Sequence, residues 1–266
     1  MRKYIELIVL NLKSSLAYRA EVYFSLLKTI LLLVVQIAIW RSLFGNDVAV
    51  QLKTGSIDLK DMINYGIIST FISIVISNGV IQIMGDKVRT GNIVMELIKP
   101  LHLMGNILSQ VIGSCLFRLL YIVLPLTVIM FIIYGFYFPS PVTFFLYIVS
   151  FINAFLIFFL ISYAISLTAF YYFEIWHFER LLDDIVKVMS GSLIPLWFFP
   201  SKLLKIIDYL PFKYIYFMPI NIYLEKIELG ESIRALVIQV IWIVLIFLLV
   251  EIMWKRVMKR IVVQGG

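Results

Sequence analysis

Residues 85–100, GDKVRTGNIVMELIKP, interrupt a chain that is otherwise almost continuously apolar. An apolar run long enough to cross a membrane lies on each side, since about 20 helical residues cross the hydrocarbon of a bilayer. If residues 85–100 are helical, Ile93 and Leu97 share an apolar face, with Val94 beside them. A short amphipathic helix of this kind can dock into a cleft on a soluble partner. An ordinary solvated loop is the alternative interpretation.

The composition is that of a membrane protein. The chain has 266 residues, of which 62% are hydrophobic and 15% are charged, and its mean hydropathy is +1.00. Soluble domains carry about 45–50% apolar and about 25% charged residues, so we expect an all-α polytopic membrane protein. The net charge of +7 does not indicate a nucleic-acid partner. The basic residues are scattered between apolar runs, as they are in cytoplasmic loops.

The apolar runs predict six transmembrane helices, at residues 22–43, 62–84, 104–134, 142–172, 182–199 and 233–254. Residues 1–20 mix apolar and charged side chains, which favours an amphipathic helix at the membrane interface. The predicted fifth span is short and contains Gly191 and Pro195, and a span interrupted in this way can mark a site in a transporter. Residues 201–211 are amphipathic but too short to span, so we expect an interfacial helix there.

Charge asymmetry orients the predicted helices, because six spans place both termini on one side of the membrane. The segments on that side carry 13 Lys and Arg, at residues 1–20, 85–103, 173–187 and 255–266. The opposite segments carry 8, at residues 41–61, 135–141 and 200–234. Cytoplasmic loops are enriched in these residues. The sequence therefore predicts that both termini and residues 85–100 are cytoplasmic.

Small and polar side chains gather on two of the predicted spans. On the second span, Gly66, Thr70, Ser73 and Ser77 follow one helical face. Close helix packing explains such a face, and so does the lining of a polar transport path. The candidate lining residues are Thr70, Ser73, Ser77, Asn78, Gln82, Ser190, Ser192 and Pro195.

Arg118 lies in the predicted third span. The apolar run is longer than one span requires, so its first residues are expected outside the hydrocarbon and Arg118 about one to two helical turns inside the cytoplasmic boundary. An intramembrane charge is a candidate functional residue, and the alternatives are snorkelling to the interface or pairing with a carboxylate. Other charged residues, such as Lys28 and Glu251, lie toward the ends of the predicted spans, and no span has a central Asp or Glu. A proton- or sodium-coupled carrier usually has such a carboxylate. We therefore expect the energy for transport to come from outside this chain.

Sequence motifs for catalysis are absent. The chain has no GxxxxGK[ST], GxGxxG, HExxH, CxxC or GxSxG motif. A single cysteine, Cys115, excludes an intrachain disulfide, and His177 has no second ligand at metal spacing. We therefore expect no catalytic, metal-binding or cofactor-binding residues in this chain.

A series of motifs resembles the membrane subunit of ABC-2 type transporters, in particular six-span permeases related to daunorubicin and viologen exporters. The motifs are Leu16-Ala17-Tyr18-Arg19, Ile39-Trp40-Arg41-Ser42-Leu43-Phe44, Asn64-Tyr65-Gly66, Arg89-Thr90-Gly91-Asn92-Ile93, Glu96-Leu97-Ile98-Lys99-Pro100-Leu101, Ser190-Gly191-Ser192-Leu193-Ile194-Pro195-Leu196, Phe199-Pro200, Leu210-Pro211-Phe212 and Pro219. Their order and spacing over nearly the whole chain carry the resemblance. Asn92 departs from many relatives, which have an acidic or other residue there.

The resemblance implies a bacterial inner-membrane permease that works with a second permease, either another copy or a related chain. Two separate ABC ATPase subunits would bind ATP and Mg, so this chain would not itself be an enzyme. Residues 1–20 correspond to a connecting helix and residues 85–100 to a coupling helix that docks on the ATPase. The second and fifth spans would line the substrate path between the permeases, and short re-entrant helices would follow the fifth span.

By the same resemblance, the residues expected to couple to the ATPase are Asp86, Arg89, Thr90, Gly91, Ile93, Glu96, Leu97 and Pro100. The expected function is export by alternating access of an amphipathic or hydrophobic molecule, such as a drug, antibiotic, peptide or lipid-like compound. The alternative is a permease or scaffold for ions or nutrients that is not coupled to an ATPase.

Overall fold

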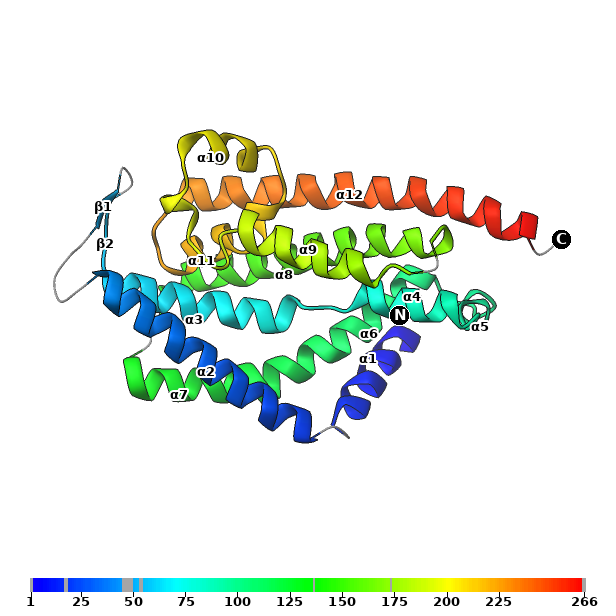
Figure 1. Cartoon of the computed structure of the whole chain (residues 1–266), viewed down its shortest axis with the longest axis horizontal. Helices are drawn as coiled ribbons and strands as arrows, with labels where there is room; N and C mark the ends of the chain where they lie inside the picture. The colour runs from blue at the N-terminus through cyan, green and yellow to red at the C-terminus, as the bar shows by residue number, and fades with distance from the viewer. Residues whose placement is uncertain are drawn as a thin grey trace.

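The computed structural model describes residues 2–16, 19–44, 50–52, 55–135, 137–172 and 174–264, and this part of the chain is mostly helical (Figure 1). The first half contains α1 (Arg2–Ser15), α2 (Arg19–Phe44), β1 (Val50–Leu52), β2 (Gly55–Ile57), α3 (Leu59–Ile76), α4 (Val80–Arg89), α5 (Ile93–Leu97), α6 (Leu103–Arg118), η1 (Leu119–Val123) and α7 (Leu124–Tyr134). The second half contains α8 (Pro141–Ser166), η2 (Leu167–Phe170), α9 (Trp176–Met189), η3 (Leu196–Phe198), α10 (Ser201–Asp208), η4 (Phe212–Tyr214), α11 (Phe217–Tyr223) and α12 (Leu229–Gln264).

Five helical segments of the described chain are long and apolar enough to cross a membrane. They are Val22–Phe44, Leu59–Arg89, Leu103–Tyr134, Pro141–Phe170 and Leu229–Lys259. They overlap five of the six predicted spans, and the predicted span at 182–199 is not among them. In its place α9 covers 14 residues and ends at Met189, which is shorter than the bilayer requires.

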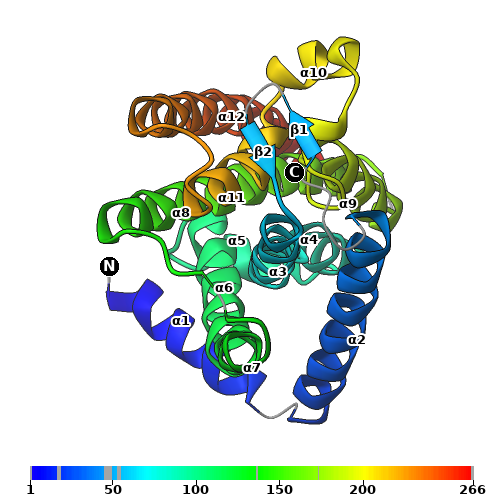
Figure 2. The same ribbon diagram turned by 90° about the vertical axis from the view of Figure 1, so that its left-hand side faces the viewer.

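Several helices, among them α3, α8, α9 and α12, run along the long axis of the molecule, so the chain has two distinct ends. Figure 1 places the start of α1, α4, α5 and the end of α12 toward one end, and the β strands, α10 and α11 toward the other. Seen from the second end, α3 lies near the centre (Figure 2), and it contacts α2, α6, α8 and α11. Most side chains of α3 are buried, so the other helices pack around it.

The N-terminal helix α1 packs along α6 at two glycines of α6. A Cβ atom added to Gly113 would lie 2.7 Å from the carbonyl oxygen of Ile8 and 2.8 Å from Asn11 Cβ. At Gly105 it would lie 3.0 Å from the Tyr4 ring. Small residues let helices approach this closely in membranes. The amphipathic helix predicted within residues 1–20 is thus present as α1, and it lies against the bundle.

The third apolar segment contains a π-helical turn, η1, between α6 and α7. Pro125 lies in the first turn of α7. A proline at this point has no N–H to donate and would clash with the carbonyl group four residues earlier in a regular helix. A π turn changes the hydrogen-bond spacing locally, and such turns are frequent at functional sites. Here it starts directly after Arg118.

The second apolar segment is broken between α3 and α4, where the sequence predicts a continuous helix. Gly79 has a φ of 59°, a left-handed conformation that glycine adopts at little cost. The last carbonyl groups of α3 therefore lack intrahelical partners. The Nη2 of Arg118 donates to the carbonyl oxygen of Val75, at 3.5 Å, and to that of Ser77. A side chain of α6 thus supports the break.

A second break follows α9, as Gly191 and Pro195 predict. Gly191 has a φ of 81°, and the chain leaves the helix there. The Tyr65 hydroxyl donates to the Gly191 carbonyl oxygen at 2.6 Å, and the Ser69 hydroxyl donates to the Ser192 carbonyl oxygen at 2.7 Å. An unpaired carbonyl is costly at membrane depth. Both donors belong to α3, so the central helix holds this break in place.

The segment before α12 is more deeply packed than its sequence pattern indicates. Residues Pro219 to Tyr223 of α11 are all buried. On α12, Gln239 Nε2 donates to the carbonyl oxygens of Ser150, at 3.1 Å, and Tyr214, at 2.9 Å. This buried amide ties the region before α11 to α8 and α12. The short antiparallel pair β1–β2, in the loop before α3, does not follow from the sequence pattern either.

Candidate functional site

Residues 85–100 form a compact corner between the second and third apolar segments. Thr90 closes the last turn of α4, because its N–H and Oγ1 donate to the Asp86 carbonyl oxygen at 3.0 and 2.7 Å. Gly91 has a φ of 75°, and a Cβ atom there would meet nothing within 4 Å. The left-handed backbone, rather than lack of space, therefore favours glycine. The chain turns here into α5.

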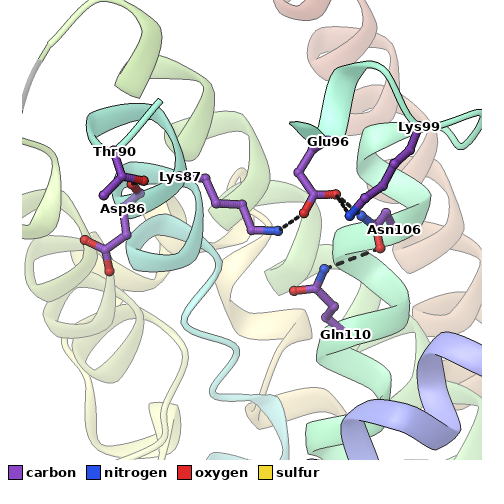
Figure 3. Close-up of polar contacts among 7 residues, drawn as sticks. All are labelled: Asp86, Lys87, Thr90, Glu96, Lys99, Asn106 and Gln110. Carbon is purple, nitrogen blue, oxygen red and sulfur yellow. Dashed lines mark hydrogen bonds and ion pairs between the residues drawn. The ribbon is translucent and has the colours of Figure 1, made fainter. Parts of the chain in front are cut away.

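Glu96 joins three parts of this corner (Figure 3). Its carboxylate accepts hydrogen bonds from Lys87 of α4 at 2.7 Å, from Lys99 after α5 at 3.1 Å and from Asn106 of α6 at 2.5 Å. Gln110 on α6 donates to the Asn106 amide oxygen at 3.3 Å. Side-chain contacts therefore link α4, α5 and α6, in addition to the chain itself.

The Lys87–Glu96 ion pair is largely shielded from solvent, with side chains 19% and 11% exposed. Burial alone would raise the pKa of Glu96, but hydrogen bonds from Lys87 and Lys99 outweigh it and lower that pKa. Glu96 is therefore ionised at neutral pH and keeps its contacts. The Arg89–Asp86 pair, at 3.2 Å, is more than half exposed, and such surface pairs contribute little.

The corner presents an apolar tip to its surroundings. Val94, Met95 and Ile98 are 57%, 60% and 69% exposed, whereas Ile93 is 7% exposed. Leu97 is partly buried and packs against the core. The sequence predicts that Ile93 and Leu97 face a partner, and the structure differs because this pair, four residues apart, anchors α5 to the protein. The apolar tip is therefore Val94, Met95 and Ile98.

The other residues expected to contact an ATPase lie in the same corner. Apart from Ile93, Leu97 and Glu96, all of them are exposed, namely Asp86, Arg89, Thr90, Gly91 and Pro100. The corner thus combines an inner half that fixes it to the helices with an outer half that is open to contact.

A cavity of about 1360 Å³ lies between α2, α3, the junction of α6 with η1 and the segment that follows α9. Several hydroxyl groups and apolar side chains line it. Of the residues predicted for a transport path, Thr70, Ser73 and Ser77 of α3 line this cavity, as does Ser192 after α9. The structure thus brings half of the predicted set together around one space.

The remaining predicted path residues do not line this cavity. Asn78 Nδ2 donates to Ser162 Oγ at 3.2 Å, and Asn78 Oδ1 accepts from the backbone two residues further on at 3.1 Å. Asn78 therefore supports the break between α3 and α4. Ser190 and Pro195 are buried, and Gln82 lines a smaller cavity of about 580 Å³ beside α9.

Arg118 lines the large cavity and also holds the carbonyl groups of the broken second segment. A guanidinium carries five N–H donors, so it can support the break and still present positive charge to the cavity. The sequence leaves three roles open for Arg118: a functional charge, snorkelling to the interface, or pairing with a carboxylate. The structure shows a further role, in which the guanidinium group donates to backbone carbonyl oxygens of a neighbouring helix.

The contribution of α2 to the cavity was not predicted. Ser25, Lys28, Thr29 and Gln36 line it, together with Trp40 one turn further on. The first four residues recur at i, i+3, i+4 and i+11, which is one helical face. This spacing was the available signal, and it is faint because α2 is otherwise strongly apolar.

The fold and the cavity define a multi-pass membrane protein whose helices line a partly polar space that is open on one side. The sequence matches the family model described as ABC-2 family transporter protein over residues 53–265, and the chain belongs to that family. The match includes residues 85–100, α3 and the segment after α9. A search of curated proteins gave no match. The chain is therefore a membrane protein of a transporter family.

Proposed function

We propose that the chain is the membrane-spanning permease subunit of an ATP-driven exporter in a bacterial inner membrane. The observation that carries this proposal is the corner at residues 85–100. It exposes Val94, Met95 and Ile98 on a segment that Glu96 fixes to two neighbouring helices. An exposed apolar tip with charged neighbours suits a cleft on a soluble partner.

The partner would be a pair of ABC ATPase subunits that bind ATP and Mg. Movement of such a partner would act on α5 and reach α4 through Lys87 and α6 through Asn106, because both hold the Glu96 carboxylate. α4 and α6 belong to apolar segments that flank the cavity. The proposed result is a change in the relative stability of inward- and outward-open states.

The cavity of about 1360 Å³ is the proposed substrate path. Its hydroxyl and apolar lining suits an amphipathic or hydrophobic molecule, in keeping with the usual make-up of ligand pockets. A second permease, either another copy or a related chain, would complete the path. Exposed apolar side chains are available for that contact, namely Leu181 and Val188 on α9 and Leu193 after it.

The test is co-purification of the chain with the ABC ATPase encoded beside it, followed by transport and ATP hydrolysis in proteoliposomes. Ile98→Asp should abolish co-purification, because it places a charge in the centre of the apolar tip. Ile206→Asp on α10 is the matched control, since Ile206 is 57% exposed at the opposite end of the molecule. If wild type fails to bind any ATPase, or if both variants bind equally well, the ATP-driven proposal is wrong and uncoupled transport or scaffolding is favoured.

A further inference from the structure

The charged groups that line the large cavity are all basic. Among the described residues, its lining includes Lys28, Arg118 and Lys187 and no Asp or Glu. It also includes nine Ser and Thr residues, namely Ser15, Ser25, Thr29, Ser69, Thr70, Ser73, Ser77, Ser114 and Ser192. Six of these hydroxyl groups already donate to backbone carbonyl oxygens, namely those of Ser15, Thr29, Ser69, Thr70, Ser114 and Ser192. The groups of the lining that suit an anion are therefore chiefly the ammonium and guanidinium groups.

The basic and the aromatic side chains of the lining lie toward opposite ends of the cavity. Lys28 lies in the first half of α2, and Arg118 contacts Ser77 at the end of α3. Because α3 runs antiparallel to α2 (Figure 1), these two positions lie toward the same end of the cavity. Trp40 lies near the other end of α2, where its ring stacks on Phe198 at a centroid distance of 6.0 Å. The cavity therefore has a basic end near α4 and an aromatic, apolar end toward the β strands.

The three basic side chains differ in the partners that they have within the protein. Lys187 lies 3.3 Å from Asp184, a carboxylate that does not line the cavity, and both are more than half exposed. Arg118 contacts the carbonyl oxygens of the broken second segment. Lys28 has neither a hydrogen bond nor an ion pair among the described residues. The charge of Lys28 is thus not balanced by an ion pair among the described residues.

We infer that the transported molecule is an anionic amphiphile, bound with its acidic head group near Lys28 and Arg118 and its apolar chain toward Trp40 and Phe198. This inference rests on the proposed function, whose substrate class it narrows. The volume of about 1360 Å³ exceeds the roughly 300–1,000 Å³ common for pockets of drug-sized ligands, which favours a long-chain molecule. A cationic amphiphile would meet repulsion at the basic end.

Binding can be measured without the ATPase, so this test is separate from that of coupling. The full chain is placed in phosphatidylcholine nanodiscs and titrated with three probes that share one tail: ω-bromoundecyl sulfate, ω-bromoundecyl glucoside and ω-bromoundecyl trimethylammonium. Bromine quenches tryptophan fluorescence on contact, and Trp40 lies at the proposed tail end. The part of the quenching that Trp40→Phe removes reports binding in the cavity.

The sulfate should bind at least about tenfold more tightly than the ammonium compound, with the glucoside between them. Lys28→Gln should weaken sulfate binding about tenfold and leave glucoside binding unchanged, as expected for loss of one charge-assisted contact. Lys205→Gln on α10 removes the same charge outside the lining and should change neither. A second titration compares phosphatidylglycerol with phosphatidylcholine, both carrying brominated acyl chains. If the natural ligand is a membrane lipid, the anionic phosphatidylglycerol should bind more tightly. If it is a soluble single-chain amphiphile, the two lipids should bind equally.

Equal affinity for the three head groups, or an equal effect of Lys28→Gln and Lys205→Gln, would overturn the inference. Anion-selective binding by a protein that binds no ATPase would refute ATP-driven export and leave the head-group assignment standing. Lys28→Gln keeps the test decisive even if substitutions of Arg118 prevent folding, because Lys28 makes no hydrogen bond or ion pair among the described residues.

Discussion

The ammonium group of Lys87 on α4 lies 2.7 Å from the carboxylate of Glu96 on α5, and both side chains are largely shielded from solvent. The same carboxylate accepts a hydrogen bond from Asn106 of α6. Glu96 therefore bonds to a side chain of the second apolar segment and to a side chain of the third.

Glu96→Gln should reduce the amount of substrate transported per ATP hydrolysed several-fold, while the ATPase remains bound. The amide keeps the shape of the side chain but loses its charge, and hydrogen bonds to charged groups contribute about 1.5–3 kcal/mol. The apolar tip is unchanged, so docking should persist. The measurement is coupled transport and phosphate release in proteoliposomes.

Glu6→Gln is the control for this substitution. Glu6 pairs with Arg2 at 3.1 Å, but the two side chains are 63% and 94% exposed, and exposed helix pairs contribute little. It should leave the transport ratio unchanged. An unchanged ratio in Glu96→Gln as well would show that the carboxylate network is not part of the coupling.

The stabilising effect of Glu96 should depend on pH. Its pKa is lowered in the folded protein, because hydrogen bonds from Lys87 and Lys99 outweigh the effect of burial. Its contribution is therefore present above the ordinary glutamate pKa of about 4.3 and is lost as the pH falls through the lower folded-state value. The difference in Tm between wild type and Glu96→Gln should be constant from about pH 5.5 to 7 and shrink below about pH 4. A difference that grows on acidification would reverse the sign of this assignment.

Arg118→Gln should destabilise the protein by about 1–3 kcal/mol, because it removes the donors that the carbonyl groups of Val75 and Ser77 use at the helix break. Arg118→Lys should lose less, since it keeps the charge but not the planar fork. A thiol-reactive dye can follow unfolding through Cys115, the one cysteine of the chain. Equal stability of Arg118→Gln and wild type would assign the arginine to the cavity alone.

Ser73→Leu and Asn78→Leu should have opposite effects. Ser73 lines the cavity, so a leucine there should narrow the substrate range while the yield of folded protein stays near wild type. Asn78 bonds to Ser162 and to the backbone at the break, so its substitution should lower the yield before it alters selectivity. The measurements are monodisperse yield and transport over a compound panel. The reverse pattern would place the path on the other side of α3.

The long helices were predictable because each is a run of apolar residues well above the length that a bilayer requires. The break after α9 was also predictable, since Gly191 and Pro195 are local signals. The break at Gly79 was not, because a single glycine inside a long apolar segment does not interrupt its hydropathy. Two of the groups that support that break are distant in sequence: Arg118 is 41 residues from Ser77, and Ser162 is 84 residues from Asn78. They can be located only in three dimensions.

The orientation of α5 shows a second limit of sequence-based prediction. Ile93, Val94, Leu97 and Ile98 are all apolar, so their pattern gives one apolar surface without saying which part faces inward. Packing decides this, and it buries Ile93 while leaving Ile98 69% exposed. Likewise, the polar residues of α2 become a cavity lining only because α3 and α6 pack beside them.

The break at Gly79 divides the second apolar segment into two bodies with different attachments. α3 is bonded to the chain after α9 through Tyr65 and Ser69, whereas α4 is bonded to α5 through Lys87. Arg118 contacts the joint between them and also faces the cavity. Thermodynamic linkage is reciprocal. Under the proposed function, a substrate that binds to Arg118 and changes the angle at this joint would bind with an affinity that depends on that angle. Substrate binding and the position of α4 would then each influence the other.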